Sequence, residues 1–224
     1  MLVKYVARFS FIHYSVDATL RNIVPTRYHK AIPHIFDLIA NIYLLWRLYT
    51  IPQEHLQLQI PNDFYQTERV SILDDHMNLE LAWYISTSIF ILYSGKRSLS
   101  MLLHHMIAIG FIKLSMVANV TKLGIHLIRY MNISNPFLHL TRTFHSFEMK
   151  TLSTLSFLVF FTIYTYFRIV SFPISYAWFV FDTVGHYWRV DRPILFMASC
   201  TNIGLIYVVQ LYWYWKMVGI IMRL

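Results

Sequence analysis

The chain has 224 residues, of which 57% are hydrophobic and only 13% are charged. Soluble domains carry about 25% charged residues, so this composition argues against a soluble globule, and 6 Gly and 7 Pro exclude collagen-like or linker-rich architectures. The formal charge of +8 comes from basic residues scattered between apolar segments. This pattern indicates topology signals and contacts with anionic headgroups, and nucleic-acid binding is not expected.

Residues 1–30 form a basic segment ahead of the first long apolar stretch. They contain five cations and one acid, namely Lys4, Arg8, Arg21, Arg27, Lys30 and Asp17. Because positively charged segments stay on the cytosolic side of a membrane, we predict a cytosolic N-terminal segment. Two of the cations interrupt the early apolar run and no A-x-A-like site follows, so a cleaved signal peptide is not expected.

Six later segments approach the length of about 20 apolar residues that a membrane-spanning helix needs. They cover residues 32–51, 79–95, 99–119, 123–140, 153–172 and 195–219. Several contain polar residues that are costly to expose to lipid, so these should face the interior of a helix bundle. We therefore predict an all-α integral membrane protein, with a bundle of about six transmembrane helices around a polar-lined cavity.

The loops between these segments alternate in charge. Residues 52–78 carry five acids and a single Arg, whereas cations follow the second, fourth and sixth segments at Lys96, Arg97, Arg142, Lys150, Lys216 and Arg223. Since cytosolic loops are enriched in Lys and Arg, the pattern predicts that both termini are cytosolic. Arg189 and Arg192 do not fit this alternation.

The connection 173–194 is aromatic and leaves the number of spans open, because it suits an interfacial helix, a re-entrant helix or an additional span. Within it, Asp182 and His186 have the spacing of one helical face, which favours a structural hydrogen bond over half of a metal site. Cys200 lies in an apolar stretch and is interpreted as a small buried hydrophobe.

The adjacent residues His104 and His105 lie inside an apolar helix and are the candidate catalytic residues. Neighbouring helical positions are about 100° apart, so both side chains can line a wide cavity at one depth. A histidine in a membrane span needs a hydrogen-bond partner, which leaves catalysis or ligand contact and a bond to a neighbouring helix as alternatives. We expect no metal site, because a single His-His pair lacks the further His-rich boxes of membrane di-iron enzymes.

The stretch NISNPFLHLTRTFH, residues 132–145, supplies most of the candidate ligand-binding residues. Pro136 removes a backbone donor, so a kinked helix lined by Asn132 and Ser134 is predicted. Arg142 would lie at the cytosolic mouth and pair with a phosphate or carboxylate, while Arg168 lies near the other end of the fifth segment. The alternative for both arginines is a cation that reaches the membrane surface without binding a ligand.

Four motifs in sequence order together resemble the TLC domain, named for its TRAM, Lag1 and CLN8 homology. They are a basic loop followed by LLHHMIAIG, then NISNPFLHL, then Tyr166–Phe167–Arg168, and finally QLYWYWKM. The resemblance covers about residues 31–220. It implies a bundle of six or more helices around a long cavity, residence in the endoplasmic reticulum, and an association with acyl chains and sphingolipids.

Ceramide synthases, the enzymatic branch of that family, combine the His-His helix with an HDxxDxxLE pattern on a neighbouring helix. This chain has NISNPFLHLTRTF instead, which resembles the branches outside Lag1. If the protein is an enzyme, the resemblance favours acyl transfer, with His104 or His105 as nucleophile or general base, acyl-CoA as co-substrate and no other cofactor. The competing class is a non-enzymatic regulator of membrane lipid composition or a cargo receptor.

Membrane lipids are the expected partners under either hypothesis, and self-association is left open. The abundance of Ile, Tyr, Phe and Asn with few Gly and Ala indicates an AT-rich coding sequence. Such a sequence is consistent with a parasite or a large virus, and in the second case the membrane would be that of the host.

Overall fold

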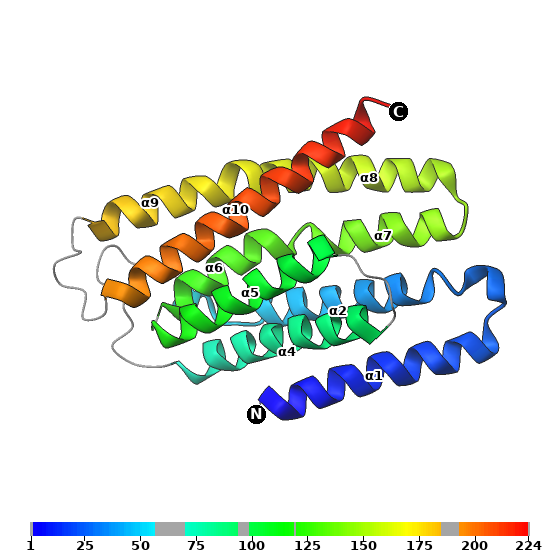
Figure 1. Cartoon of the computed structure of the whole chain (residues 1–224), viewed down its shortest axis with the longest axis horizontal. Coiled ribbons are helices and arrows are strands. Elements are labelled where there is room, and N and C mark those ends of the chain that lie inside the picture. The colour runs from blue at the N-terminus through cyan, green and yellow to red at the C-terminus, as the bar shows by residue number, and fades with distance from the viewer. Residues whose placement is uncertain (1, 57–69, 94–98, 119, 185–192, 224) are drawn as a thin grey trace.

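The computed structural model describes residues 2–56, 70–93, 99–118, 120–184 and 193–223. Regular structure in this part of the chain is helical throughout, and the long helices run roughly parallel to one axis (Figure 1). The helices are α1 (Leu2–Ile23), η1 (Thr26–Tyr28), α2 (Ile32–Tyr49), α3 (Gln53–Leu56), α4 (Ser71–Tyr93), α5 (Leu99–Val117), α6 (Thr121–Asn132), α7 (Asn135–Ser146), α8 (Lys150–Tyr164), η2 (Thr165–Ser171), α9 (Phe172–Val184) and α10 (Pro193–Ile221). The all-α prediction is therefore confirmed.

Within the described residues, three helical stretches are long and apolar enough to cross a membrane: Leu99–Val117, Lys150–Trp178 and Met197–Ile221. The other predicted spans carry charged side chains or are broken, so the predicted number of six is approximate. Large apolar side chains on these helices are exposed at the surface, among them Leu155, Ile174 and Trp215. Such a surface is unfavourable in water and suits the hydrocarbon of a bilayer.

Helix α4 lies at the centre of the bundle and packs against α1, α2, α5 and α6. Its buried residues Leu73, Met77 and Leu81 join Phe111 of α5 and Leu127 of α6 in the main apolar core. Gly124 of α6 allows this close approach, because a Cβ there would lie 2.8 Å from both Met77 Cε and Ser115 Cβ. The central position of α4 explains why its polar side chains meet partners from several helices.

Helix α1 packs against the bundle, although its sequence predicted only a basic segment ahead of the domain. Lys4 and Arg8 are exposed, whereas Tyr5 and Phe9, one turn apart on the opposite side, pack beside Trp83 of α4. The Phe9 and Trp83 rings meet edge to face with centroids 5.7 Å apart. This amphipathic pattern brings the next residue on the same face, His13, into a buried position.

The predicted kink before Pro136 is confirmed as a break between two helices. Helix α6 ends at Asn132, residues Ile133 and Ser134 form a turn, and α7 begins at Asn135 with Pro136 in its first turn. Proline suits the first turn of a helix, because the backbone N–H that it lacks would have no helical acceptor there. Figure 1 shows α6 and α7 following one another along the bundle, so together they occupy the place of the fourth predicted span.

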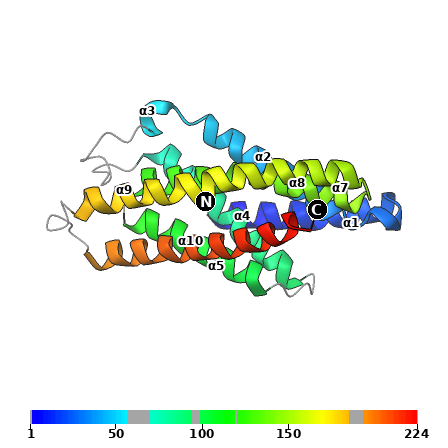
Figure 2. The ribbon, with the colours of Figure 1, turned by 90° about the horizontal axis from the view of Figure 1, so that it is seen from above.

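The fifth predicted span continues beyond its expected end. Helix α8 passes through the π-helical segment η2 directly into α9, which ends at Val184. Residues 173–184 therefore extend this helix, and Figure 2 shows α8 and α9 in one line. His186, Arg189, Arg192 and the side chain of Asp182 lie outside the described residues, so the predicted Asp182–His186 pair is not tested.

Candidate functional site

His104 and His105 both lie on α5 and face the central helix α4. The His105 ring centroid lies 5.5 Å from that of Tyr84, and the His104 centroid lies 6.5 Å from the same ring. The two imidazoles are 5.9 Å apart. Both histidines are half-buried. The predicted pair therefore lies at the junction of α4 and α5, beside a buried tyrosine.

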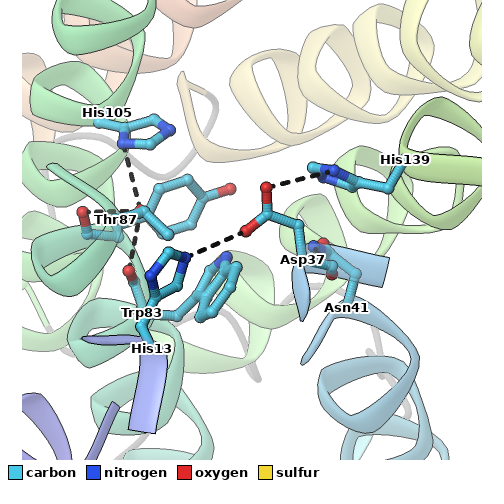
Figure 3. A network of polar contacts seen from close by, with 8 residues as sticks. His13, Asp37, Asn41, Trp83, Thr87, His105 and His139 are labelled. Atoms are coloured by element: carbon cyan, nitrogen blue, oxygen red, sulfur yellow. Dashed lines mark hydrogen bonds and ion pairs between the residues drawn. The ribbon is translucent and has the colours of Figure 1, made fainter. Parts of the chain in front are cut away.

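Two hydroxyl groups of α4 hold the His105 ring. His105 Nδ1 lies 3.3 Å from Thr87 Oγ1 (Figure 3) and 3.2 Å from Ser88 Oγ. Thr87 donates its own hydroxyl proton to the carbonyl of Trp83 at 2.9 Å, and Ser88 donates to the carbonyl of Tyr84 at 2.7 Å. Because each hydroxyl proton is directed to a backbone carbonyl, each hydroxyl oxygen is free to accept a hydrogen bond from His105 Nδ1–H. This arrangement favours the tautomer in which Nε2 of His105 is the unprotonated nitrogen.

A second group of polar side chains connects Arg168 to Glu80 through two amides. Arg168 donates to Asn135 Oδ1, Asn135 donates to Asn132 Oδ1 at 3.3 Å, and Asn132 donates to Glu80 Oε1 at 2.7 Å. Arginine can only donate and a carboxylate can only accept, so the charges at the two ends fix the orientation of both amides. We call Arg168, Asn135, Asn132 and Glu80 the amide relay.

The two ends of the amide relay are buried. Arg168 is 7% exposed and Glu80 is 1% exposed. Among the described residues, the acceptors of Arg168 are neutral: Asn135, the carbonyl of Met131, and Gln210 Oε1 at 3.2 Å. Since an uncompensated buried charge is costly, the relay lets one buried charge compensate the other without direct contact. His76 lies 3.5 Å from Glu80 on the preceding turn of α4.

Arg168 lies within the π-helical segment η2, which brings it beside Tyr164 and α10. The guanidinium lies 4.8 Å from the centre of the Tyr164 ring. The Tyr164 hydroxyl donates to Gln210 Oε1 at 2.6 Å, so Gln210 receives hydrogen bonds from both residues. Segments of π-helix occur frequently at functional sites. This segment carries Arg168, which is the more buried of the two arginines predicted to bind a ligand.

A third polar cluster lies where α1, α2 and α7 meet. Asp37 of α2 lies between two histidines, with Oδ2 3.5 Å from His139 Nδ1 and Oδ1 3.9 Å from His13 Nε2 (Figure 3). His34, one turn before Asp37, places a ring nitrogen within 4.8 Å of ligand atoms of both Asp37 and His139. We call His13, His34, Asp37 and His139 the Asp37 cluster.

The structure divides the residues predicted from sequence between these clusters. Asn132 and Arg168 belong to the amide relay, and Ser134 is fully buried in the turn beside it. Arg142, by contrast, lies on α7 and interacts electrostatically with Asp37. Ligand binding by these four residues stays a prediction.

Sequence reasoning missed the residues that complete the clusters. Glu80 and Tyr164 belong to none of the motifs, although an acid within an apolar segment, as at Glu80, is the kind of signal that marks an interior position. Gln210 opens the QLYWYWKM motif, but its polar role was not predicted. Asp37 and His34 have the i, i+3 spacing of one helical face, but His13 and His139 come from distant parts of the sequence. Only the packing of α1 and α7 against α2 brings them together.

A helical bundle with apolar outer surfaces and buried charged side chains defines an integral membrane protein. Residues 27–219 match the TLC domain, which is most of the chain. The protein therefore belongs to the TLC-domain family, a membrane family linked to lipid metabolism and lipid sensing. No curated protein sequence matches the chain.

Proposed function

We propose that the protein binds a membrane lipid beside the His104–His105 pair and acts as a non-enzymatic regulator of membrane lipid composition. The observation that supports this best is the hydrogen bonding of His105, which leaves Nε2 as an acceptor. Among the described residues His104 makes ring contacts only, so its nitrogens are available to a ligand. Two imidazoles beside apolar helices suit the hydroxyl, amine or amide groups at the polar end of a lipid.

The choice of binding over acyl transfer rests on the partners of the buried acids. In a catalytic triad a carboxylate orients the histidine and stabilises its protonated form. Here Asp37 contacts His13 and His139, while Glu80 contacts Asn132 and His76. Within the described part of the chain, hydroxyl groups take the place of a carboxylate at His105, and hydroxyls stabilise a protonated imidazole less well.

Acyl transfer from acyl-CoA is the second candidate, and one observation favours it. The tautomer of His105 places a lone pair on Nε2, which can accept a proton from the attacking amine or hydroxyl group of a lipid. The thioester carbon would then be attacked by that amine or hydroxyl, with coenzyme A leaving as the thiol. Arg142 would contact an anionic headgroup or a coenzyme A phosphate, in keeping with its place on α7.

The experiment compares purified wild-type protein with His104→Leu/His105→Leu and His105→Gln in lipid nanodiscs. His126→Gln is the matched control, because His126 is also partly buried and bonds only to Tyr130 on its own helix among the described residues. Co-purifying lipids are measured by mass spectrometry, and acyl-CoA consumption is measured with lipid amines and alcohols as acceptors.

We expect a lipid to co-purify with wild type and with the His126 variant. Its amount should fall by tenfold or more in the double leucine variant, which corresponds to about 1.4 kcal/mol of binding free energy. None of the proteins should consume acyl-CoA. An identical lipid profile in all variants would reject the binding site. Consumption of acyl-CoA by wild type, and its loss in His105→Gln, would establish the second candidate instead. Expression of the full chain with a fluorescent tag in cells tests the expected location in the endoplasmic reticulum.

A further inference from the structure

The Asp37 cluster has the composition and the geometry of a transition-metal site. Imidazole nitrogen and carboxylate oxygen are the ligands that Zn²⁺ and other divalent transition metals bind in proteins, whereas Ca²⁺ and Mg²⁺ prefer oxygen alone. His34, Asp37 and His139 each offer one such atom, and the three atoms lie within 4.8 Å of one another. We propose that these three residues bind a divalent transition-metal ion such as Zn²⁺.

The distance between Asp37 and His139 supports a metal ion over a direct hydrogen bond. Asp37 Oδ2 and His139 Nδ1 are 3.5 Å apart, and this nitrogen is buried without a hydrogen-bond acceptor or donor in the described structure. A direct bond between such groups would be about 2.7–3.2 Å long. Two ligands at about 2.0–2.1 Å from a tetrahedral Zn²⁺ lie roughly 3.4 Å apart, which agrees with the separation observed here.

The helices bring the ligands together without strain in the backbone. His34 and Asp37 are separated by three residues on α2 and therefore lie on one face of that helix. His139 comes from α7, which packs closely along α2. The fourth position would be open to water or to a ligand.

His13 has a supporting role in this site. Its Nε2 lies 3.9 Å from the second oxygen of Asp37, and its ring packs against Phe36 and Phe90 with centroids 4.3 and 3.8 Å away. At 3.9 Å this contact is longer than a hydrogen bond, and it would orient the carboxylate electrostatically. Removal of a residue that orients a metal ligand usually costs 10–100-fold in affinity. The metal site thus connects α1 to α2 and α7.

One neighbouring charge opposes the ion. Arg142, on the turn after His139, interacts electrostatically with Asp37 and His139. A cation bound at the Asp37 cluster would be repelled by this guanidinium, so removal of the Arg142 charge should tighten metal binding. If Arg142 only stabilised the fold, its removal would weaken metal binding. Tighter binding in Arg142→Gln therefore could not result from a loss of structure.

The proposal differs from the sequence expectation of no metal site, which considered the His-His pair of α5. It is also independent of the proposed lipid function.

The test uses full-length protein that is purified with a histidine-free affinity tag and stripped of metal with a chelator. The protein is then titrated with Zn²⁺, and Co²⁺ serves as a spectroscopic probe of the coordination. The variants are His139→Gln, Asp37→Asn, His13→Gln and Arg142→Gln, and the matched control is His145→Gln on the same helix α7.

We expect one Zn²⁺ per chain in wild type and in His145→Gln, with a visible Co²⁺ absorption typical of a tetrahedral site. Binding should weaken by more than a hundredfold in His139→Gln and Asp37→Asn and by about 10–100-fold in His13→Gln. It should strengthen by several-fold in Arg142→Gln. Weak binding that is equal in wild type and all variants would overturn the proposal, as would Co²⁺ absorption that persists unchanged in His139→Gln.

Discussion

The amide relay and the Asp37 cluster both place charged and polar groups inside the bundle, but they differ in how tightly those groups are bonded. In the relay, Asn132 reaches Glu80 at 2.7 Å, and Tyr164 reaches Gln210 at 2.6 Å. In the Asp37 cluster the charged atoms are 3.5–3.9 Å apart. The members of the relay are joined by direct hydrogen bonds, although Arg168 Nε and Glu80 Oε2 have no partner among the described residues. The wider spacing in the Asp37 cluster leaves room for a further atom.

The two regions also differ in the number of helices that they join. The relay and its neighbours connect α4, α6, α7, η2 and α10, so it ties the two halves of the bundle together. The Asp37 cluster joins α1 and α7 to α2 on one side of the molecule. We therefore expect substitutions in the relay to reduce stability most, and substitutions in the Asp37 cluster to affect ligand binding most.

Arg168→Gln should have the largest effect on stability. It removes the buried cation that compensates Glu80 through the relay and leaves His76, 3.5 Å away, as the remaining partner of that charge. We expect a loss of about 3–5 kcal/mol in the free energy of unfolding. Thermal and denaturant unfolding in detergent micelles would measure it, with Arg21→Gln as control. Arg21 forms an exposed ion pair with Asp17, so its loss should cost about 1 kcal/mol or less. Equal effects of the two substitutions would contradict the charge compensation.

A double-mutant cycle between Glu80 and Arg168 should show the next largest effect. If the two charges compensate through Asn132 and Asn135, Glu80→Gln will lower the free energy of unfolding of wild type. The same substitution will lower it much less in the Arg168→Gln variant. The expected coupling energy is about 1–3 kcal/mol. Simple additivity of the two unfolding free energies would mean that the amides do not connect the charges.

Removal of the hydroxyl groups beside His105 tests a smaller interaction. Thr87→Val together with Ser88→Ala deletes both acceptors of Nδ1–H and should cost about 1–2 kcal/mol, since each hydrogen bond contributes about 1 kcal/mol. The double variant should also retain less lipid, because the two hydroxyl groups no longer fix the tautomer of His105. Thr162→Val is a suitable control, as its exposed hydroxyl bonds only to Leu158 on the same helix. A double variant that retains lipid like wild type would argue against a role for the tautomer.

Asp37→Asn should have the smallest effect on the stability of the metal-free protein. Contacts of 3.5–3.9 Å are longer than hydrogen bonds, so we expect a change of about 1 kcal/mol or less. Unfolding measured in the presence of a chelator provides the value for comparison with Arg168→Gln. A loss as large as that of Arg168→Gln would remove the distinction between the two regions.

The helical membrane fold and the break before Pro136 could be predicted from the sequence. Each depends on neighbours in the chain, namely the length of the apolar segments and the missing proline N–H. A functional role of the His104–His105 pair stays a prediction. The amide relay could be predicted only in part, because Asn132 and Arg168 stand out as polar residues while Glu80 and Gln210 acquire their roles from packing. The Asp37 cluster could not be predicted, because it depends on α1 lying against the bundle.

The π-helical segment η2 has a consequence for how a long helix lies against a straight neighbour. Tyr164, Arg168, Phe172 and Tyr176 are spaced by four residues, and on a regular α-helix such a stripe rotates by about 40° at each step. The wider turn at η2 reverses part of that rotation. All four side chains consequently face α10, where Gln210 meets Tyr164 and Arg168, Tyr207 stacks on Phe172, and the carbonyl of Cys200 accepts a bond from Tyr176. Deletion of one residue from η2 would turn the second half of this stripe away from α10, so the segment sets the register between the two helices.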